Sequence, residues 1–379
     1  ELNLQTGANL QGVTQGSGNA GNVMLNVGTL RSNVNPDLSP IAGAQTVLIS
    51  TESRAVGAAG TVTIRGVAGQ ANPNAPAQLV ALNNTTVSTE VGQIAAVNAP
   101  PGHIAVTADT VNLTGDTQIT ASTSGAASAG NITFNTGSLT ANNGALISST
   151  NTTASGNGSG NAGSVTIQGL TGTGSSAASV TINNATVTTS TGIAATAGNA
   201  PATISMATNN LSLTAGAQIK ADTSGGARAG DIILNAGTTS LQSGAKISTI
   251  STSTNPLNAG TAGNIALTSA SDIMLTDSSI TTQAAQASGG NIKLTAPGIV
   301  LLDNSKITSS VNGPAGSNGG NISIDPQFVI LLNGSQILAQ AVGGNGGNIT
   351  IVTNTFLDEP GTLIDASSSL GISGEIVGI

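Results

Sequence analysis

The fold is decided by a short stretch that recurs along the chain, as in Gly290-Asn291-Ile292-Lys293-Leu294. Each copy is a small residue, a polar residue and then Val or Ile. The copies begin at Gly21, Gly60, Gly102, Gly130, Gly163, Ala202, Gly230, Gly263, Gly290, Gly320, Gly347 and Gly374. Self-similarity at a period of roughly 27 to 42 residues is typical of a solenoid, in which each repeat buries its apolar face against its neighbours.

Each repeat contains three apolar segments. In the repeat that opens at Gly290 they are 292–294, 299–302 and a third that starts at Ile307. Segments this short and this rich in β-branched residues are typical of strands, because a helix needs about ten residues at a period near 3.6. The pattern predicts an all-β parallel β-helix, or solenoid, of about twelve coils with three short strands each.

The composition agrees with a long, thin core. Hydrophobic residues make up 38% of the chain, which also has 51 Gly, 1% aromatic residues and neither Trp nor Tyr. A narrow core has room for aliphatic side chains, whereas large rings would push the coils apart. We expect one interior column to contain Ile104, Ile132, Val165, Ile204, Ile232, Ile265, Ile292, Ile322 and Ile349.

The repeats predict one continuous rod over 1–379. Within 1–262 the coils form a three-coil super-repeat of roughly a hundred residues and are decorated by inserts. The inserts lie at 31–43, 66–78 and 169–179, whereas the coils of 263–379 are tighter and plain. Because residue 1 falls inside a coil, we expect the array to be an excerpt of a longer one.

Charge and composition exclude several classes of partner. The net charge is −8 and only eight Lys and Arg are spread over the chain, which argues against nucleic-acid binding. The sequence has no apolar run long enough to span a membrane. It also has no Cys and a single His, so we expect no cofactor.

The coil openings, the Gly-Ala-x-Ile segments such as 216–219 and 244–247, and the closing stretch 363–374 resemble the filamentous haemagglutinin-like exoproteins of bacterial two-partner secretion. This resemblance implies export through an outer-membrane transporter and folding as a right-handed β-helix. It also implies a place on the surface of a Gram-negative-type bacterium. The expected roles are adhesion or a fibre or biofilm matrix, with partners such as further copies of the chain, a host or neighbouring cell surface, or a polysaccharide.

The polar residue after the coil-opening glycine has a structural interpretation. Equivalent residues of successive coils stack about 4.8 Å apart, so Asn264, Asn291, Asn321 and Asn348 should form a ladder whose amides bond to one another and to the turn backbone. The glycine before each Asn is expected to supply unusual backbone angles. His103 stands where other coils have Asn and should take its place in the ladder.

Carbohydrate-active enzymes also use this fold, so a catalytic site is the main alternative. Such a site needs paired carboxylates, or an Asp-bound calcium ion with a basic residue. The nearest candidate, for catalysis or for a metal, is the pair Asp277 and Asp303, with Lys306 as the one basic neighbour. A turn role for these carboxylates is favoured, and the prediction is a non-catalytic adhesive or structural rod.

Ice binding is a more remote alternative, since a flat Thr-rich face can bind ice. The residue after each core Ile or Val of the third strand forms a column that is expected to be exposed. This column contains Ser50, Ser88, Thr120, Ser148, Thr188, Lys220, Ser248, Thr281, Thr308, Leu338 and Asp365. Its companion column mixes charges with hydroxyls, beginning with Glu52 and Glu90, which favours an ordinary solvated strand face.

Overall fold

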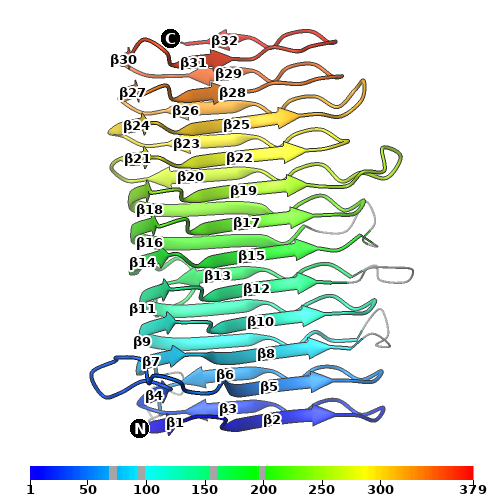
Figure 1. Ribbon diagram of the computed structural model, residues 1–379, viewed down its shortest axis with the longest axis vertical. Helices are drawn as coiled ribbons and strands as arrows, with labels where there is room; N and C mark the ends of the chain where they lie inside the picture. The colour runs from blue at the N-terminus through cyan, green and yellow to red at the C-terminus, as the bar shows by residue number, and fades with distance from the viewer. Residues whose placement is uncertain (68–74, 93–98, 153–159, 194, 196–200, 379) are drawn as a thin grey trace. The chain divides into compact units, whose positions relative to one another are not determined.

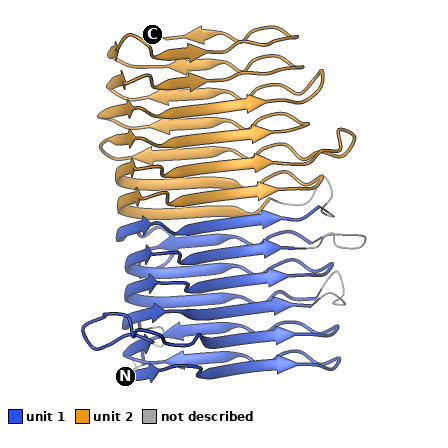
Figure 2. Ribbon diagram, viewed as in Figure 1, with its two compact units in different colours: residues 1–194 blue, residues 195–379 orange. Residues whose placement is uncertain are grey.

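The computed structural model describes residues 1–67, 75–92, 99–152, 160–193, 195 and 201–378. Over these residues the secondary structure consists of strands and turns, with no helix. The chain divides into two compact units, 1–194 and 195–379 (Figure 2). We call them unit 1 and unit 2 and describe each by itself.

Unit 1 consists of three rows of parallel strands, one for each side of the coil (Figure 1). The first row contains β3 (Val23–Asn26), β6 (Val62–Arg65), β9 (Ile104–Thr114), β11 (Ile132–Asn142) and β13 (Val165–Gln168). The second contains β1 (Leu2–Leu4), β4 (Thr29–Ser32), β7 (Ala77–Asn83), the second halves of β9 and β11, and β14 (Ala177–Asn183). The third contains β2 (Asn9–Thr14), β5 (Val47–Ser53), β8 (Thr85–Val91), β10 (Gln118–Thr123), β12 (Leu146–Asn151) and β15 (Thr186–Thr191).

Unit 2 repeats this arrangement. Its first row contains β16 (Thr203–Thr214), β18 (Asp231–Gln242), β20 (Ile265–Ser269), β23 (Ile292–Thr295), β26 (Ile322–Asp325), β29 (Ile349–Ile351) and β32 (Ile376–Val377). Its second contains the second halves of β16 and β18, then β21 (Ile273–Thr276), β24 (Ile299–Asp303), β27 (Phe328–Leu332) and β30 (Thr355–Asp358). Its third contains β17 (Gln218–Thr223), β19 (Lys246–Ser251), β22 (Ser279–Ala284), β25 (Lys306–Val311), β28 (Gln336–Leu338) and β31 (Leu363–Asp365).

The predicted all-β parallel solenoid is confirmed, while its right-handedness stays a prediction. The interior column forms within each unit. In unit 1, Ile104, Ile132 and Val165 pair in register. In unit 2, the register joins Ile204, Ile232, Ile265, Ile292, Ile322 and Ile349. Each of these side chains is at most 1% exposed, because successive strand residues point alternately into the core and outward.

Coils differ in whether their first two strands are separate. In β9 and β11 of unit 1, the two strands run together without a turn, as they do in β16 and β18 of unit 2. In the coils that contain β6 and β13, the first two strands are separate elements. From Asn264 onward, the ladder residues of successive coils are 27, 30 and 27 residues apart.

The inserts lie between strands. The first starts inside β4, and its residues Val34 and Pro40 form an antiparallel bridge before β5 begins. The second lies between β6 and β7, with residues 68–74 outside the described part of the chain. The third lies between β13 and β14, and its last residues belong to β14. Inserts at these corners leave the stacking of the core undisturbed.

Candidate functional site

The four ladder asparagines join successive coils at the corner before the first row. The side-chain Oδ1 of Asn264 accepts a hydrogen bond from the backbone N–H of Asn291 at 2.9 Å. Asn291 accepts from Asn321 at 2.9 Å and Asn321 from Asn348 at 2.8 Å. Asn348 accepts from the N–H of Glu375 at 2.9 Å. Each bond therefore runs from a backbone donor to a side-chain acceptor one coil away.

What this ladder requires is an acceptor rather than an amide. Asp231 stands in the same column and accepts from the N–H of Asn264 at 2.7 Å. In unit 1, Nδ1 of His103 accepts from the N–H of Asn131 at 2.9 Å. Burial lowers the pKa of His103, which favours the neutral ring, whose Nδ1 can accept a hydrogen bond. The sequence predicted hydrogen bonds between side-chain amides of successive coils. In these contacts a side chain instead accepts a hydrogen bond from a backbone N–H of the next coil.

A second ladder, which the sequence reasoning missed, lies three residues before the first. Asn318 accepts from the N–H of Asn345 at 2.9 Å, and Asn345 accepts from the N–H of Ile372 at 3.0 Å. In unit 1, Asn19 does the same for the N–H of Ala58 at 3.0 Å. The spacing Asn-Gly-Gly-Asn, present at 318–321 and 345–348, is the signal that predicts both ladders together.

The ladder yields a stability prediction at Asn321. Asn321→Ala removes the acceptor for the N–H of Asn348 and should lower the free energy of unfolding by about 1 kcal/mol. Asn321→Asp keeps an oxygen in the same place and should cost less than about half of that. Urea unfolding followed by circular dichroism measures both. Equal losses from the two variants would contradict the acceptor interpretation.

The coil-opening glycines have a different role from the one expected, and this corrects the sequence analysis. None of those that the structure describes has a φ in the left-handed region. Instead, a methyl group on Gly290 would overlap the carbonyl oxygen of Gly263 in the preceding coil. The carbonyl oxygens of these glycines also accept hydrogen bonds from buried side chains. For example, Thr282 Oγ1 donates to the carbonyl oxygen of Gly290 at 2.7 Å. Glycine is required here because successive backbones approach too closely for a Cβ atom.

Left-handed backbone occurs at the corner after the second row, where Asn and Asp adopt it. Asp277, Asn304 and Asn333 have φ values of 49°, 46° and 51°. Asp277 Oδ1 accepts from Asn304 Nδ2 at 2.6 Å, and Asp303 Oδ1 accepts from Asn333 Nδ2 at 2.6 Å. In the strand register, Asp303 lies opposite Thr276 rather than Asp277. The structure therefore places the two candidate carboxylates in neighbouring columns, each bound to its own asparagine.

The third-row column of hydroxyls is in register within each unit but is less exposed than expected. Ser50, Ser148 and Thr188 are only 4%, 5% and 8% exposed. Short side chains in this column lie between equivalent side chains of the coils above and below, which cover them. Ser148 and Thr150 also share a hydrogen bond of 2.7 Å between their hydroxyls. Ser50, Ser148 and Thr188 are therefore buried positions of this column and not part of an open lattice.

Asp222 on β17 is the ionisable residue whose environment is most unusual. Its Oδ1 is buried without a hydrogen-bond partner among the described residues. Burial raises the pKa of Asp222 to about 6, against the opposing effect of the Lys220 ammonium group. Asp222 lies in the companion column of the third row and pairs in register with Ile250 of the next coil, so an apolar neighbour was the available signal of its burial.

The raised pKa predicts a pH effect on stability. Because the folded chain holds the Asp222 proton more tightly than the unfolded chain, this group stabilises the fold below pH 4. That stability is lost as the pH rises from about 4 to about 6. Asp222→Asn should remove the loss, so that its advantage over the wild type grows to about 3 kcal/mol at pH 7. Urea midpoints at pH 4 and pH 7 measure the difference, and an advantage that does not change with pH would contradict the prediction.

The described residues contain no group of three or more His, Asp or Glu side chains placed to hold a metal ion. Nor do they contain an apolar helix of membrane-spanning length. Comparison of the sequence with protein-family models and with curated proteins, and of the fold with solved structures, finds no match.

Proposed function

We propose that the chain is a non-catalytic structural and adhesive stalk, secreted to the surface of a Gram-negative-type bacterium. The support is its parallel solenoid fold together with the resemblance of its coils to filamentous haemagglutinin-like exoproteins. On this proposal, an outer-membrane transporter exports the chain. Its partners are then further copies of itself, a host or neighbouring cell surface, or a polysaccharide.

The observation that carries the proposal is how the polar side chains are used. Ladder asparagines bind the backbone of the next coil, and Thr249 and Thr282 bind glycine carbonyls from inside the core. Asp277 and Asp303 are each held by an asparagine amide. These side chains are thus engaged in joining one coil to the next, as a repetitive stalk requires.

A carbohydrate-active enzyme is the second candidate, and Asp222 is the observation in its favour. A carboxyl group with a raised pKa is suited to general-acid catalysis. Glycoside hydrolysis, however, uses two carboxyl groups about 5 to 10 Å apart. The charged group that affects the pKa of Asp222 is Lys220, not a second carboxylate. The stalk is therefore the better-supported function.

Two measurements test the stalk. Antibodies against the 379-residue chain should label the surface of intact cells of the source bacterium. Deletion of the gene should reduce attachment of those cells to surfaces or to one another. Labelling that requires permeabilised cells would overturn the proposal. Release of new reducing ends or unsaturated sugars from a polysaccharide panel, lost in Asp222→Asn, would favour the enzyme.

A further inference from the structure

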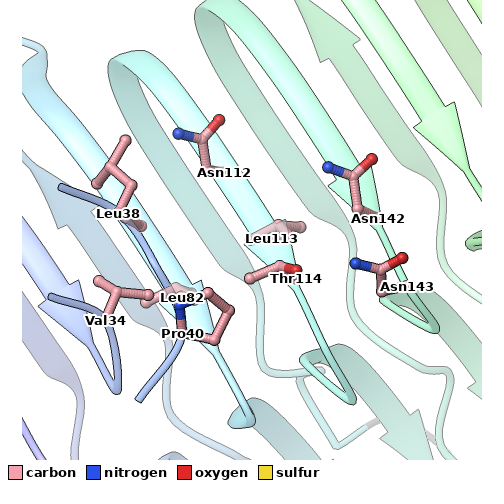
Figure 3. Close-up of a pocket in the computed structure, with 10 residues that line it drawn as sticks. Val34, Leu38, Pro40, Leu82, Asn112, Leu113, Thr114, Asn142 and Asn143 are labelled. Carbon is pink, nitrogen blue, oxygen red and sulfur yellow. The ribbon is translucent and has the colours of Figure 1, made fainter. Parts of the chain in front are cut away.

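A hollow of about 330 Å³ lies in unit 1 where the first insert folds back toward the second row (Figure 3). Val34, Leu38 and Pro40 of the insert form one side of it. Asn142 and Asn143 lie on the opposite side. Thr114 and Asn112 lie between the insert and these two asparagines. The insert side of the hollow is thus apolar, while the strand side combines these polar groups with Ala81, Leu82 and Leu113.

The insert that forms the apolar side is firmly attached. Val34 and Pro40 form an antiparallel bridge, and the N–H of Asn35 donates to the carbonyl of Ser39 at 2.9 Å. At its base, Asn33 Nδ2 donates to the carbonyl of Gln45 at 2.9 Å. Asn83 Nδ2 donates to the carbonyl of Asn33 at 3.2 Å. The apolar side of the hollow is therefore held in place by backbone and amide bonds.

The polar side carries unused hydrogen-bonding groups. The side-chain amides of Asn112, Asn142 and Asn143 form no hydrogen bond with any residue that the structure describes. Each amide offers two donors and an acceptor. Nearer the insert, the amides of Asn83 and Asn33 hold the loop. Asn112, Asn142 and Asn143, which come later in the chain, face the hollow instead.

Leu38 marks the insert as a specialised loop. It has a φ of 68° and is 37% exposed, although leucine is poorly suited to the left-handed region. Glycine or asparagine would adopt this backbone with less strain. A strained residue that presents an apolar side chain at the edge of a hollow is the kind of feature that binding sites retain.

The lining selects one ligand class. No ionisable side chain is among the lining residues, so a charged ligand finds no counter-charge. A purely apolar ligand would leave three amides and the Thr114 hydroxyl unpaired, which is unfavourable. A sugar ring suits both sides, because its hydroxyls donate and accept while its C–H face is apolar. The volume lies at the lower end of small-ligand pockets.

We propose that this hollow binds a neutral hexose unit of a glycan. The inference rests on the proposed adhesive function and names the class of its partner. The amides of Asn112 and Asn142 would bind ring hydroxyls, and Leu38 and Pro40 would cover the C–H face.

The test is ligand-observed NMR with the full 379-residue chain. The probes are the methyl glycosides of glucose, galactose and mannose, the disaccharides maltose and cellobiose, and glucuronate. At least one neutral sugar should bind, more tightly than glucuronate. Asn142→Ala should weaken that binding about fivefold, the effect of one neutral hydrogen bond. Asn183→Ala is the matched control, because Asn183 pairs with Asn142 in register and lies outside the hollow.

A second variant separates binding from folding. Leu38→Gly removes the apolar edge but relieves the backbone strain, so it should weaken sugar binding without lowering the melting temperature. Absence of binding by every neutral probe would overturn the proposal. So would equal effects of Asn142→Ala and Asn183→Ala on the dissociation constant.

The same variants distinguish failure of the hollow from failure of the stalk. Beads coated with wild-type chain should adhere to cells, and beads coated with Asn142→Ala should adhere less. Full adhesion by the Asn142→Ala beads would overturn the sugar site and leave the adhesive stalk intact. Sugar binding in solution by a chain that is found only inside cells would overturn the stalk and keep the site.

Discussion

Ile292→Asp should lower the free energy of unfolding by about 4 kcal/mol or more. Ile292 is 1% exposed and stacks between Ile265 and Ile322 in register. The variant loses the apolar packing of a buried isoleucine and places a carboxyl group where no polar partner is available. Because the two neighbours belong to adjacent coils, the damage should spread along unit 2.

Thr308→Asp is the control for this effect. Thr308 lies on the outer face of β25, directly after the buried Ile307, so its substitution should change the free energy of unfolding by less than about 1 kcal/mol. Urea unfolding followed by circular dichroism measures both variants, since the chain has no Trp or Tyr for fluorescence. Similar losses from Ile292→Asp and Thr308→Asp would mean that the strand faces are assigned wrongly.

Gly130→Ala should destabilise unit 1 by about 3 kcal/mol, at the upper end of the cost of overpacking. The added methyl group would overlap the backbone carbonyl oxygen of Gly102, which cannot rotate away as a side chain can. That oxygen also accepts a hydrogen bond from buried Thr89 at 2.8 Å. The two coils must therefore separate locally, which weakens the bonds on both sides of the corner.

Gly28→Ala is the matched control in the same unit. Gly28 also has no left-handed φ, and a methyl group there would meet no atom within 4 Å. Its substitution should be neutral or slightly stabilising, because alanine restricts the unfolded chain. If both glycine variants unfold at the same urea concentration, close approach of the coils is not what requires glycine at position 130.

The sequence predicted the core well because a solenoid is locally determined. The residue two positions after each coil-opening glycine is apolar, and the period-two alternation that follows decides which side chains point inward. Ile104 and Ile132 pair in register as expected, as do Ile265 and Ile292. Such pairings need only the repeat itself, since each coil meets a near copy of its own sequence.

The site residues were predicted less completely. The positions of the ladder asparagines follow from the repeat, but the direction of their bonds depends on where the next backbone N–H points. The glycines show the same limit, because their role depends on the distance to the preceding coil rather than on their own φ. Buried Thr249 and Thr282 were also missed, since a hydroxyl in a strand usually indicates an outer face.

By itself, the sequence determined the fold class and the interior column, because both depend on repetition at short range. Only the tertiary structure decided which polar groups remain free. Asp277 and Asp303 lie one residue out of register and each bind an asparagine, whereas Asn142 faces a hollow that the first insert encloses. The insert interrupts the repeat, and where a loop folds back onto its neighbours depends on contacts between residues far apart in the chain.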